Sequence, residues 1–469
     1  MNLKPYILLL IIAFPLALRG QQSTVVLTPE KLLWFIKNYH PVSVQSDLLI
    51  AKGESTLRKA RGAFDPYLYS QIDQKHFNDK NYFSIHNSGL KVPTWFGVEI
   101  KTGFDQNNGA FLNPENTVPS GGLWYGGVSV PLGKNLLIDK RRAILQQAKL
   151  FSESTGVQQQ KLMNDLYFDG MKEYWKWVEV WNQYLVYEEY LELALERFEA
   201  VKKSFSFGDI PAIDTLEAFI QVQNRQMNRS QSYLDYQNTT LGLSNFMWFE
   251  NLTPLVITDS MKPPVVAEIV LNSLISAETF YDLMFLLQES HPEMRLYDFK
   301  LADMNVEKRL KAESLKPKIN INYNVLNEPL GSDVLSGLSF ENYKWGLAFS
   351  FPLFLREQRG DLQLTRLKIQ ETELSQQQKL LELENKLKYY FNQQVNLQAQ
   401  VALYKDAVNN YALLLQGERR KFNAGESSLF LVNSREASLI SARIKLIELT
   451  SKYKIAQTGL IWATGNLNL

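Results

Sequence analysis

Three short segments of the chain alternate between large apolar and polar or small residues, which is the period of a β-strand. Residues 318–326, KININYNVL, carry isoleucine, tyrosine and valine on one side and lysine and asparagine on the other. Residues 345–353, WGLAFSFPL, and 124–132, WYGGVSVPL, carry mostly large apolar residues on one side and small ones on the other. The alternation predicts strands of about 9–11 residues, long enough for a tilted strand to cross a membrane. A soluble sheet packed on helices is the alternative that the strands alone leave open.

Aromatic residues stand near the ends of these segments, as they do where transmembrane strands meet the membrane–water interface. The residues concerned are Trp124, Tyr323, Trp345, Phe349 and Phe351. We expect them to lie at the membrane interfaces if the strands span a bilayer.

Two much longer stretches have the period of an amphipathic helix. No proline occurs between Pro131 and Pro211 or after Pro352, and apolar residues recur every three or four positions over about 135–204 and 357–421. A helix of ~65 residues is ~100 Å long, which exceeds a compact domain. The pattern predicts coiled-coil packing with one face in water. The alternative is a bundle of shorter helices hinged at Gly156, Gly170 or Gly417.

Each helical stretch ends at a glycine within a polar segment. The first is Gly208, in FSFGDIPAIDTLEA, and the second is Gly425, in FNAGESSLFLVNSR. Because glycine adopts backbone angles that other residues avoid, each glycine predicts a turn from which a second helix returns. After the second turn, Ser427 or Ser428 can cap the returning helix.

The same order of features occurs twice along the chain. The segment that begins NYHPVSV at Asn38 resembles the segment that begins ESHPEMR at Glu289, with His-Pro and a later proline at the same offsets. The strand segments and glycine turns follow in the same order in both halves, which indicates a tandem duplication. The expected parts are a signal peptide over 1–20, a first repeat over 21–248, a linker over 249–275 and a second repeat over 276–469.

One stretch of the first repeat has no counterpart in the second. Residues 79–120 add about 30 residues between the strand segments and contain another alternating run, from Phe96 to Phe104. We expect an extended hairpin outside the cell. An additional pair of strands in the barrel and a plug-like loop are the alternatives.

The amino terminus has the organisation of a secretory signal peptide. Lys4 precedes an apolar run from Tyr6 to Leu18, and Gly20 offers a small residue for cleavage. No later segment holds 18 consecutive apolar residues. A formal net charge of +1 gives no overall attraction to nucleic acid, and the absence of cysteine excludes disulfides and thiolate metal sites. We expect an exported protein that is soluble or a β-barrel.

Four strands per chain, two from each repeat, cannot close a membrane barrel, because about eight strands are the practical minimum. An open sheet in hydrocarbon would leave backbone groups without hydrogen bonds. If the strands span a membrane, several chains must share one barrel, and three chains would give twelve strands. The long helices would then form a tube that continues the barrel.

In these features the chain resembles the TolC-like outer membrane efflux proteins, also called outer membrane factors. The resemblance rests on the signal peptide, the duplicated order of elements, the strand ends SVPL and SFPL, the glycine turns and the closing KYKIAQTGLIWATG. It implies an α+β membrane protein: a homotrimer with a twelve-stranded β-barrel among outer-membrane lipid, continuous with a long periplasmic α-helical coiled-coil barrel. It also implies docking to a periplasmic adaptor (membrane fusion) protein and an inner-membrane pump or exporter, and passive efflux of small molecules.

The resemblance places the two glycine turns at a periplasmic tip, where an adaptor docks and a gate opens. The residues carried over to this tip are Phe205, Gly208, Asp209, Asp214, Phe422, Gly425, Glu426, Ser427, Leu431 and Ser434. Members with an acidic gate have carboxylates where this chain has Leu431 and Ser434, whereas Asp214 matches the acidic residue after the first glycine. We expect a constriction lined by Asp214, capped by Phe422 and Leu431, and apolar at that level.

Motifs for catalysis are incomplete. GGVSVPLGKN resembles a phosphate loop, but its glycine spacing is one residue too long and Asn135 replaces the serine or threonine that would hold magnesium. GESSL lacks the second glycine of a nucleophile elbow. His40 and His291 fall at equivalent repeat positions, which favours a shared helix-packing role over a metal site. We therefore expect no enzyme activity, no cofactor, no metal site and no nucleic-acid partner.

Two other functions stay open at this point. A type I protein-secretion duct would have the same features, because the partner pump mostly selects the substrate. A soluble periplasmic coiled-coil adaptor would need one helical hairpin flanked by a β module, whereas this chain has two equivalent hairpins and strand pairs.

Overall fold

The computed structural model describes residues 25–258, 260–266, 269, 276–328 and 340–467. The chain divides into two units. The helical unit comprises the described parts of Met1–Ile36, Glu173–Leu271 and Ala407–Ser451, and the sheet unit those of Lys37–Lys172, Asn272–Asp406 and Lys452–Leu469. The expected signal peptide over 1–20 lies outside the described residues, as do residues 270–275 of the expected linker.

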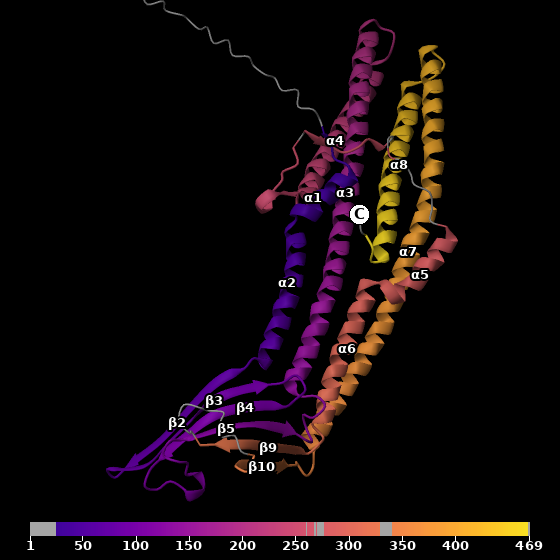
Figure 1. Ribbon diagram of the computed structural model, residues 1–469. Helices are drawn as coiled ribbons and strands as arrows, with labels where there is room; N and C mark the ends of the chain where they lie inside the picture. The colour runs from indigo at the N-terminus through magenta and orange to yellow at the C-terminus, as the bar shows by residue number, and fades with distance from the viewer. Residues whose placement is uncertain (1–24, 259, 267–268, 270–275, 329–339, 468–469) are drawn as a thin grey trace, which may run out of the picture. The chain divides into compact units, whose positions relative to one another are not determined.

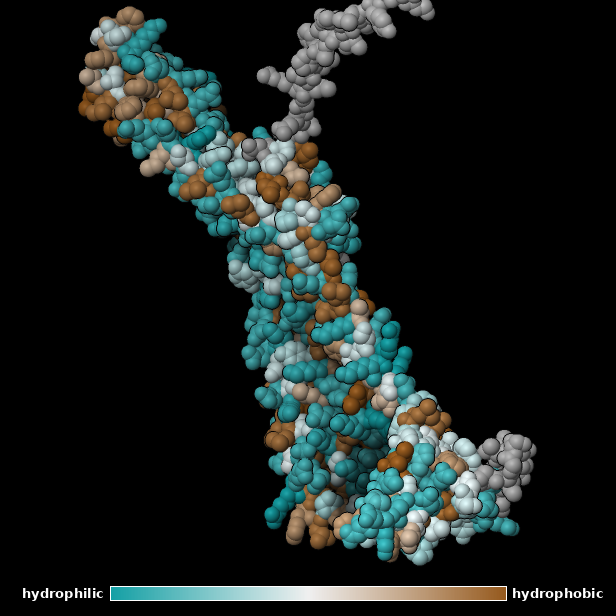
Figure 2. Space-filling model, turned by 90° about the vertical axis from the view of Figure 1, so that its left-hand side faces the viewer, coloured by the Kyte–Doolittle hydropathy of each residue, from teal (hydrophilic) through white to brown (hydrophobic). Residues whose placement is uncertain are grey.

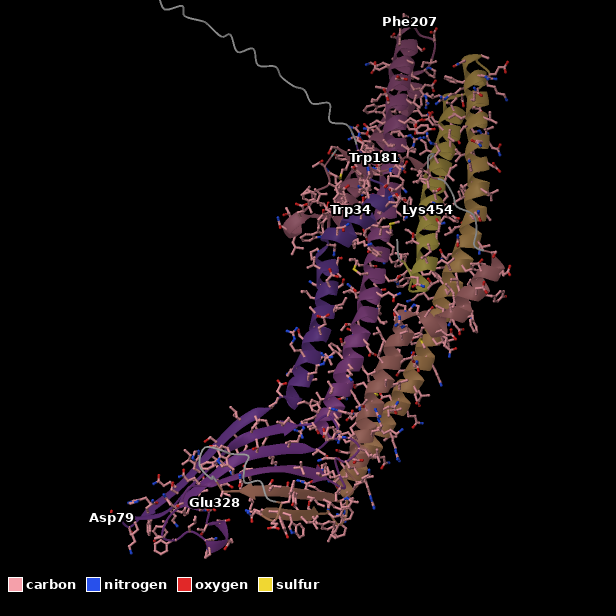
Figure 3. The ribbon with its side chains drawn as sticks, in the orientation of Figure 1. Trp34, Asp79, Trp181, Phe207, Glu328 and Lys454 are labelled. Atoms are coloured by element: carbon pink, nitrogen blue, oxygen red, sulfur yellow. The ribbon has the colours of Figure 1, made fainter. Side chains whose placement is uncertain are left out.

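Six strands form one antiparallel sheet in the sheet unit, in the order β10-β9-β5-β4-β3-β2 (Figure 1). The strands are β2 (Tyr67–Phe77), β3 (Lys80–Pro93), β4 (Glu99–Asn108), β5 (Leu123–Pro131), β9 (Lys318–Asn327) and β10 (Tyr343–Ser350). The three strands predicted from alternation are confirmed as β5, β9 and β10. Asp79 lies in the turn between β2 and β3, with a φ of 55° (Figure 3).

The expectation of four strands per chain is wrong, because the sheet of this chain has six. Residues 79–120 were expected to form a separate hairpin outside the cell, but they supply most of β3 and all of β4, which lie between β2 and β5. The physical reason is cross-strand pairing: Ile100 lies opposite Val128, and Phe104 lies opposite Trp124. The alternating run of the insertion therefore continues the apolar face of the predicted strands, and its backbone completes their hydrogen-bond ladder.

One face of this sheet is apolar on β5, β9 and β10 and mixed on β2, β3 and β4, where Ser70, His86 and Ser88 share it with apolar residues and hydrogen-bond to one another. In β9 and β10, Tyr323 pairs with Trp345 and Ile321 with Leu347, while the intervening positions pair asparagine with glycine or alanine. The register carries the same face through the rest of the sheet, where it includes Val128, Val130, Ile100, Val92, Leu90, Leu68 and Ile72. Side chains alternate between the two faces of a sheet, so the opposite face is polar.

The sheet unit also contains α2 (Pro41–Arg61), α5 (Ala277–Ser290), α6 (Pro292–Glu313) and parts of α3, α7 and α8. Its main apolar core joins α5 and α6 to α7 and α8 through Leu287, Met294, Leu387 and Leu460, which are nearly or fully buried. This core holds in place the helices that precede β9 and follow β10 in the chain.

His40 and His291 share one structural role, which is helix capping where helix packing was expected. His40 caps α2 by accepting a hydrogen bond from the amide of Val42 at Nδ1, over 3.1 Å. His291 caps α6 in the same way, accepting from the amide of Glu293 over 3.1 Å. Each is followed by proline at the first helical position, where the missing N–H costs no hydrogen bond.

The long helices are continuous. They are α3 (Lys140–Ser206) and α7 (Arg356–Asn423), and α4 (Ala212–Ser244) and α8 (Leu429–Ala463) return after the glycine turns. The alternative of shorter helices hinged at Gly156, Gly170 or Gly417 is wrong, because α3 and α7 run through these glycines. In the helical unit, Val186, Tyr190, Leu415, Val432 and Ile440 form a core between α3, α7 and α8.

Shorter elements complete the helical unit. Helix α1 (Pro29–Tyr39) begins there, β1 (Val25–Val26) pairs in parallel with β8 (Met261–Lys262), and β6 (Trp248–Phe249) pairs with β7 (Thr253–Pro254). Three single turns of 3₁₀ helix occur in the described part of the chain, at Gly62–Phe64, Pro114–Asn116 and Glu250–Leu252. Among the described residues, none of the helices combines the length and apolar character that crossing a bilayer requires.

Candidate gate at the helical turns

Both glycine turns have the same backbone geometry. Gly208 has a φ of +83°, with its amide bonded to the Phe205 carbonyl and that of Asp209 bonded to the Ser204 carbonyl. Gly425 has a φ of +75°, and the amides of Gly425 and Glu426 bond to the carbonyls of Phe422 and Lys421. This is the Schellman arrangement, in which a left-handed residue satisfies the last carbonyls of a helix. The predicted turns are confirmed, and space is open around both glycines, so backbone angle is what requires them.

The residues of the first turn are largely exposed to solvent. Phe205 is 45% exposed and Phe207 is 71% exposed, and Asp209 is exposed as well. Figure 2 shows hydrophobic side chains at the highest point of the view, level with the turn that Figure 3 marks by Phe207. Asp214 lies in the first turn of α4 and is half-buried.

The second turn is tied to the helices around it. Phe422 packs against Val201, Ala218 and Leu429, so it joins a small apolar core instead of facing solvent. The Ser427 hydroxyl donates to Oε1 of Glu418 over 2.5 Å, and Ser428 Oγ accepts from the Leu431 amide over 3.4 Å. Ser428 is therefore the cap of α8. Leu431, Ser434 and Glu426 are exposed.

A buried carboxylate below the second turn joins three helices. Glu436 on α8 is 1% exposed, and its Oε2 accepts from Arg197 on α3 and from Arg419 on α7, the latter over 3.1 Å. Buried Asn433 extends the network: its Oδ1 accepts from Arg197 over 2.9 Å, and its Nδ2 donates to Glu217 on α4 over 3.0 Å. Charge and hydrogen bonds thus connect all four helices of the two hairpins within the helical unit.

A further cation lies buried beside this network. Arg225 on α4 is 7% exposed, and its Nε has no hydrogen-bond partner among the residues that the structure describes. Burial lowers the pKa of Arg225, and the charge of Glu436 acts in the opposite direction. Glu436 therefore serves as the counter-charge for arginines on three helices. We call Glu436, Asn433, Arg197, Arg419 and Arg225 the Glu436 network.

Sequence reasoning did not identify this network, although the chain contains a signal for it. Glu436 lies four residues after Val432 and four before Ile440, both of which are buried. A charged residue on the buried stripe of a helix needs a partner, since an unpaired charge is costly there. That pattern indicates that Glu436 is a buried charge with a partner. It does not identify the partner, because Arg197 and Arg419 come from other helices.

The expected interface aromatics all lie in the sheet unit. Trp124, Tyr323, Trp345 and Phe349 belong to the apolar face through the register of β5, β9 and β10, and Phe351 follows β10. Trp345 and Phe349 are more than half exposed. The ring of Tyr323 stacks on that of Tyr343, with centroids 5.9 Å apart.

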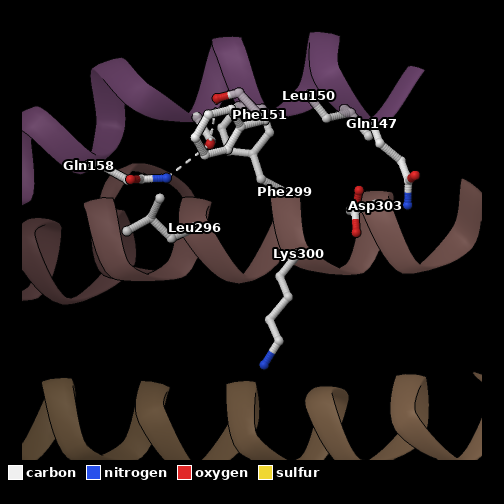
Figure 4. Close-up of a pocket in the computed structure, with 9 residues that line it drawn as sticks. Gln147, Leu150, Phe151, Gln158, Leu296, Phe299, Lys300 and Asp303 are labelled. Atoms are coloured by element: carbon white, nitrogen blue, oxygen red, sulfur yellow. Dashed lines mark hydrogen bonds between the residues drawn. The ribbon is translucent and has the colours of Figure 1, made fainter. Parts of the chain in front are cut away.

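The sheet unit also contains a cavity of about 430 Å³ between α3 and α6 (Figure 4). Phe151, Phe299 and Leu150 form its apolar wall, and Lys300 and Asp303 are its charged groups. Burial raises the pKa of Asp303. Gln158 donates to the Ser154 hydroxyl over 3.1 Å.

Comparison with known proteins links this architecture to one family. Residues 284–466 match the family described as outer membrane efflux protein. A search of curated proteins gave no match.

Solved structures share the fold over nearly the whole chain. The CmeC outer membrane channel of Campylobacter jejuni superposes with a TM-score of 0.64 at 12% identity, covering 93% of this chain and 85% of its own. The outer membrane protein VceC of Vibrio cholerae superposes with a TM-score of 0.65 at 14% identity, covering 93% of this chain and 96% of its own. The open state of the MtrE outer membrane channel of Neisseria gonorrhoeae superposes with a TM-score of 0.68 at 12% identity, covering 93% of this chain and 89% of its own. At these identities the likeness establishes the fold.

Proposed function

We propose that this chain is an outer membrane efflux protein, a channel that forms the exit duct of a tripartite export system. The observation that carries the proposal is the family match over residues 284–466, which spans α6, β9, β10, α7 and α8. The resemblance recognised in the sequence is thereby confirmed for the second half of the chain. The fold shared with outer membrane channels extends over 93% of the whole chain.

The sheet supports a location in the outer membrane. Its apolar positions include exposed large residues on β2, β4, β5 and β10, for example Leu68, Ile100 and Leu347. Exposure of so many apolar side chains on one face is unfavourable in water and suits lipid. The polar opposite face would line an aqueous lumen, as in transmembrane barrels.

Three copies would complete the channel, and their helices would form the periplasmic tube. Helices α3 and α7 have 67 and 68 residues, so each is about 100 Å long. At the turns around Gly208 and Gly425, an adaptor would dock and the duct would open. A periplasmic adaptor and an inner-membrane pump would supply the substrate and the energy.

The Glu436 network would hold the gate closed. It connects α7 and α8 to α3 and α4, so separating the hairpins would break ion pairs between buried charges. Asp214 at the start of α4 would line the aperture, with Phe422 and Leu431 as its apolar cap. Protein secretion is the second candidate for the cargo, because the described residues carry no feature that distinguishes it from small-molecule efflux.

A pair of variants of adjacent residues tests the membrane location. Leu347 belongs to the apolar face of β10 and Ala348 to the polar face. Leu347→Lys would place an ammonium against lipid, at a cost of about 2–4 kcal/mol per chain near the midplane, whereas Ala348→Lys would place it in the lumen. We expect Leu347→Lys to reduce the amount of assembled protein in outer-membrane fractions, and Ala348→Lys to leave it near the wild-type level.

Assembly and conduction complete the test. Purified mature protein in detergent should have the mass of a trimer, and it should form ion-conducting pores in planar bilayers. A detergent-free monomer, or equal tolerance of both lysine variants in the outer membrane, would refute the channel and favour a soluble protein.

A further inference from the structure

The six-stranded sheet has two open edges. Within the described residues, β2 pairs only with β3 and β10 pairs only with β9. Every residue of β10 is exposed, as are ten of the eleven residues of β2, and Leu68 on β2 is 83% exposed. Both edges are long. One side of β10 is apolar, and the matching side of β2 alternates Leu68 and Ile72 with Ser70 and Gln74. A long unpaired edge is the kind that pairs with another strand.

In a membrane, such edges must be paired, because hydrocarbon offers no hydrogen bonds to unpaired backbone groups. The strand directions limit the partner. Strand β2 runs away from helix α2 and β10 runs toward helix α7, so the two edge strands are antiparallel to one another. Pairing β2 with β2 of another copy in an antiparallel ladder would insert the two chains in opposite directions. Pairing β2 with β10 of another copy keeps both chains in the same orientation.

We propose that β2 of each chain pairs with β10 of the next copy, and that three copies close a barrel of eighteen strands in which the inserted β3–β4 hairpin is part of the wall. The inference rests on the proposed function, because it requires a trimer in a membrane. It adds what the family resemblance did not imply: each chain contributes six strands instead of four. Since barrel diameter grows roughly linearly with strand number, this pore would be about 1.5 times as wide as a twelve-stranded one.

The register at the new junction follows from symmetry. Within one chain, cross-strand neighbours lead from Leu68, near the start of β2, to Tyr343, the first residue of β10. Because the strands are tilted, this row of neighbours rises along the barrel axis from β2 to β10. Symmetry puts β2 of the next copy at the same height as β2 of the first, so Tyr343 must lie opposite a residue of that β2 that comes after Leu68. The shift must be an even number of residues, because an odd shift would exchange the apolar and polar faces.

Strand tilt selects among the even shifts. With about 3.3 Å per residue and about 4.8 Å between strands, shifts of six, eight and ten residues per chain give tilts of about 35°, 43° and 49° in an eighteen-stranded barrel. Membrane barrels have tilts of about 35–45°, so eight fits well inside the range. A shift of eight places Leu347 opposite Ile72 of the next copy, an apolar pair on the lipid side. A shift of six would place Trp345 there instead.

Disulfide cross-linking tests both parts of the inference, and the wild-type chain has no cysteine to interfere. The first variant, Ile72→Cys with Leu347→Cys, reports the junction between copies. Its matched control, Ile72→Cys with Trp345→Cys, differs by one step of register on the same face. A third variant, Ile100→Cys with Val128→Cys, reports whether β4 lies beside β5 within one chain, as their register shows.

Full-length trimers in outer-membrane vesicles would be oxidised and analysed on denaturing, non-reducing gels. We expect covalent dimers and trimers from the first variant, at least fivefold more than from its control, and an internal cross-link in the third. Trimers that conduct ions but lack the internal cross-link would overturn the eighteen-stranded barrel and leave the channel standing. Conducting trimers in which the control cross-links more strongly would overturn the register, and no cross-link in either would overturn the edge pairing. A monomer would refute the proposed function together with this inference.

Discussion

Replacing Glu436 by glutamine should open the gate, because it removes the charge that holds buried arginines together. The carboxylate is 2% exposed and pairs with Arg197, whose side chain is 17% exposed, and with Arg419. Arg225, also buried, has Glu436 as a compensating charge. Glutamine keeps the shape and one acceptor oxygen, so packing changes little while the counter-charge is lost.

The size of the effect follows from burial. Removing one partner of a buried ion pair costs about 3–5 kcal/mol, because the remaining charge stays desolvated. Separating the hairpins would return the arginines to water and relieve that cost. The equilibrium between closed and open states should therefore shift by roughly two to three and a half orders of magnitude, at about 1.4 kcal/mol per tenfold.

Single-channel recording in planar bilayers measures this shift as conductance and open probability. The matched control is Glu189→Gln, which breaks the pair between Glu189 and Arg443 in the same helical unit. Glu189 is half exposed, so its pair should contribute less than about 1 kcal/mol, and the control should conduct like the wild type. If Glu436→Gln conducted like the wild type while folding normally, the assignment of the Glu436 network to the gate would be refuted.

The remaining predictions concern stability. Gly425→Ala should lower the free energy of unfolding by about 1–2 kcal/mol, because alanine is strained at a φ of +75°. Gly417→Ala, within helix α7, should raise the free energy of unfolding by about 0.8–1 kcal/mol. Equal effects of the two substitutions in chemical denaturation would contradict the Schellman turn. Burial lowers the pKa of His291 to about 4, so the folded state keeps it neutral while the unfolded state binds a proton below about 6.5. Stability should therefore fall by about 3 kcal/mol as the pH drops from about 6.5 to about 4. His291→Asn, which keeps a helix cap, should lose this part of the pH dependence in thermal unfolding, and an unchanged pH profile would contradict the burial argument.

Local features of the molecule could be predicted from the sequence because local physics produces them. Gly208 and Gly425 end their helices through a left-handed backbone that needs no distant partner. The alternation of apolar and polar or small residues in β9 and β10 indicates which side of each strand meets an apolar environment. The length of α3 and α7 follows from the absence of proline over a long periodic stretch.

Features that depend on pairing between distant segments could not be predicted in the same way. The alternating run from Phe96 to Phe104 fits a free hairpin and a wall strand equally well, and only the register with β5 distinguishes them. Phe205 and Phe422 hold equivalent positions in the two turns, yet one is exposed and the other packs in a core, because their neighbours differ.

The sequence by itself determined the long helices, the two turns and the alternation of the strands, since each is encoded in residues close together in the chain. Only the tertiary structure decided that the sheet has six strands and that Glu436 binds arginines from two other helices. Strand order and buried ion pairs are set by which distant segments meet, and a single chain read in order does not contain that information.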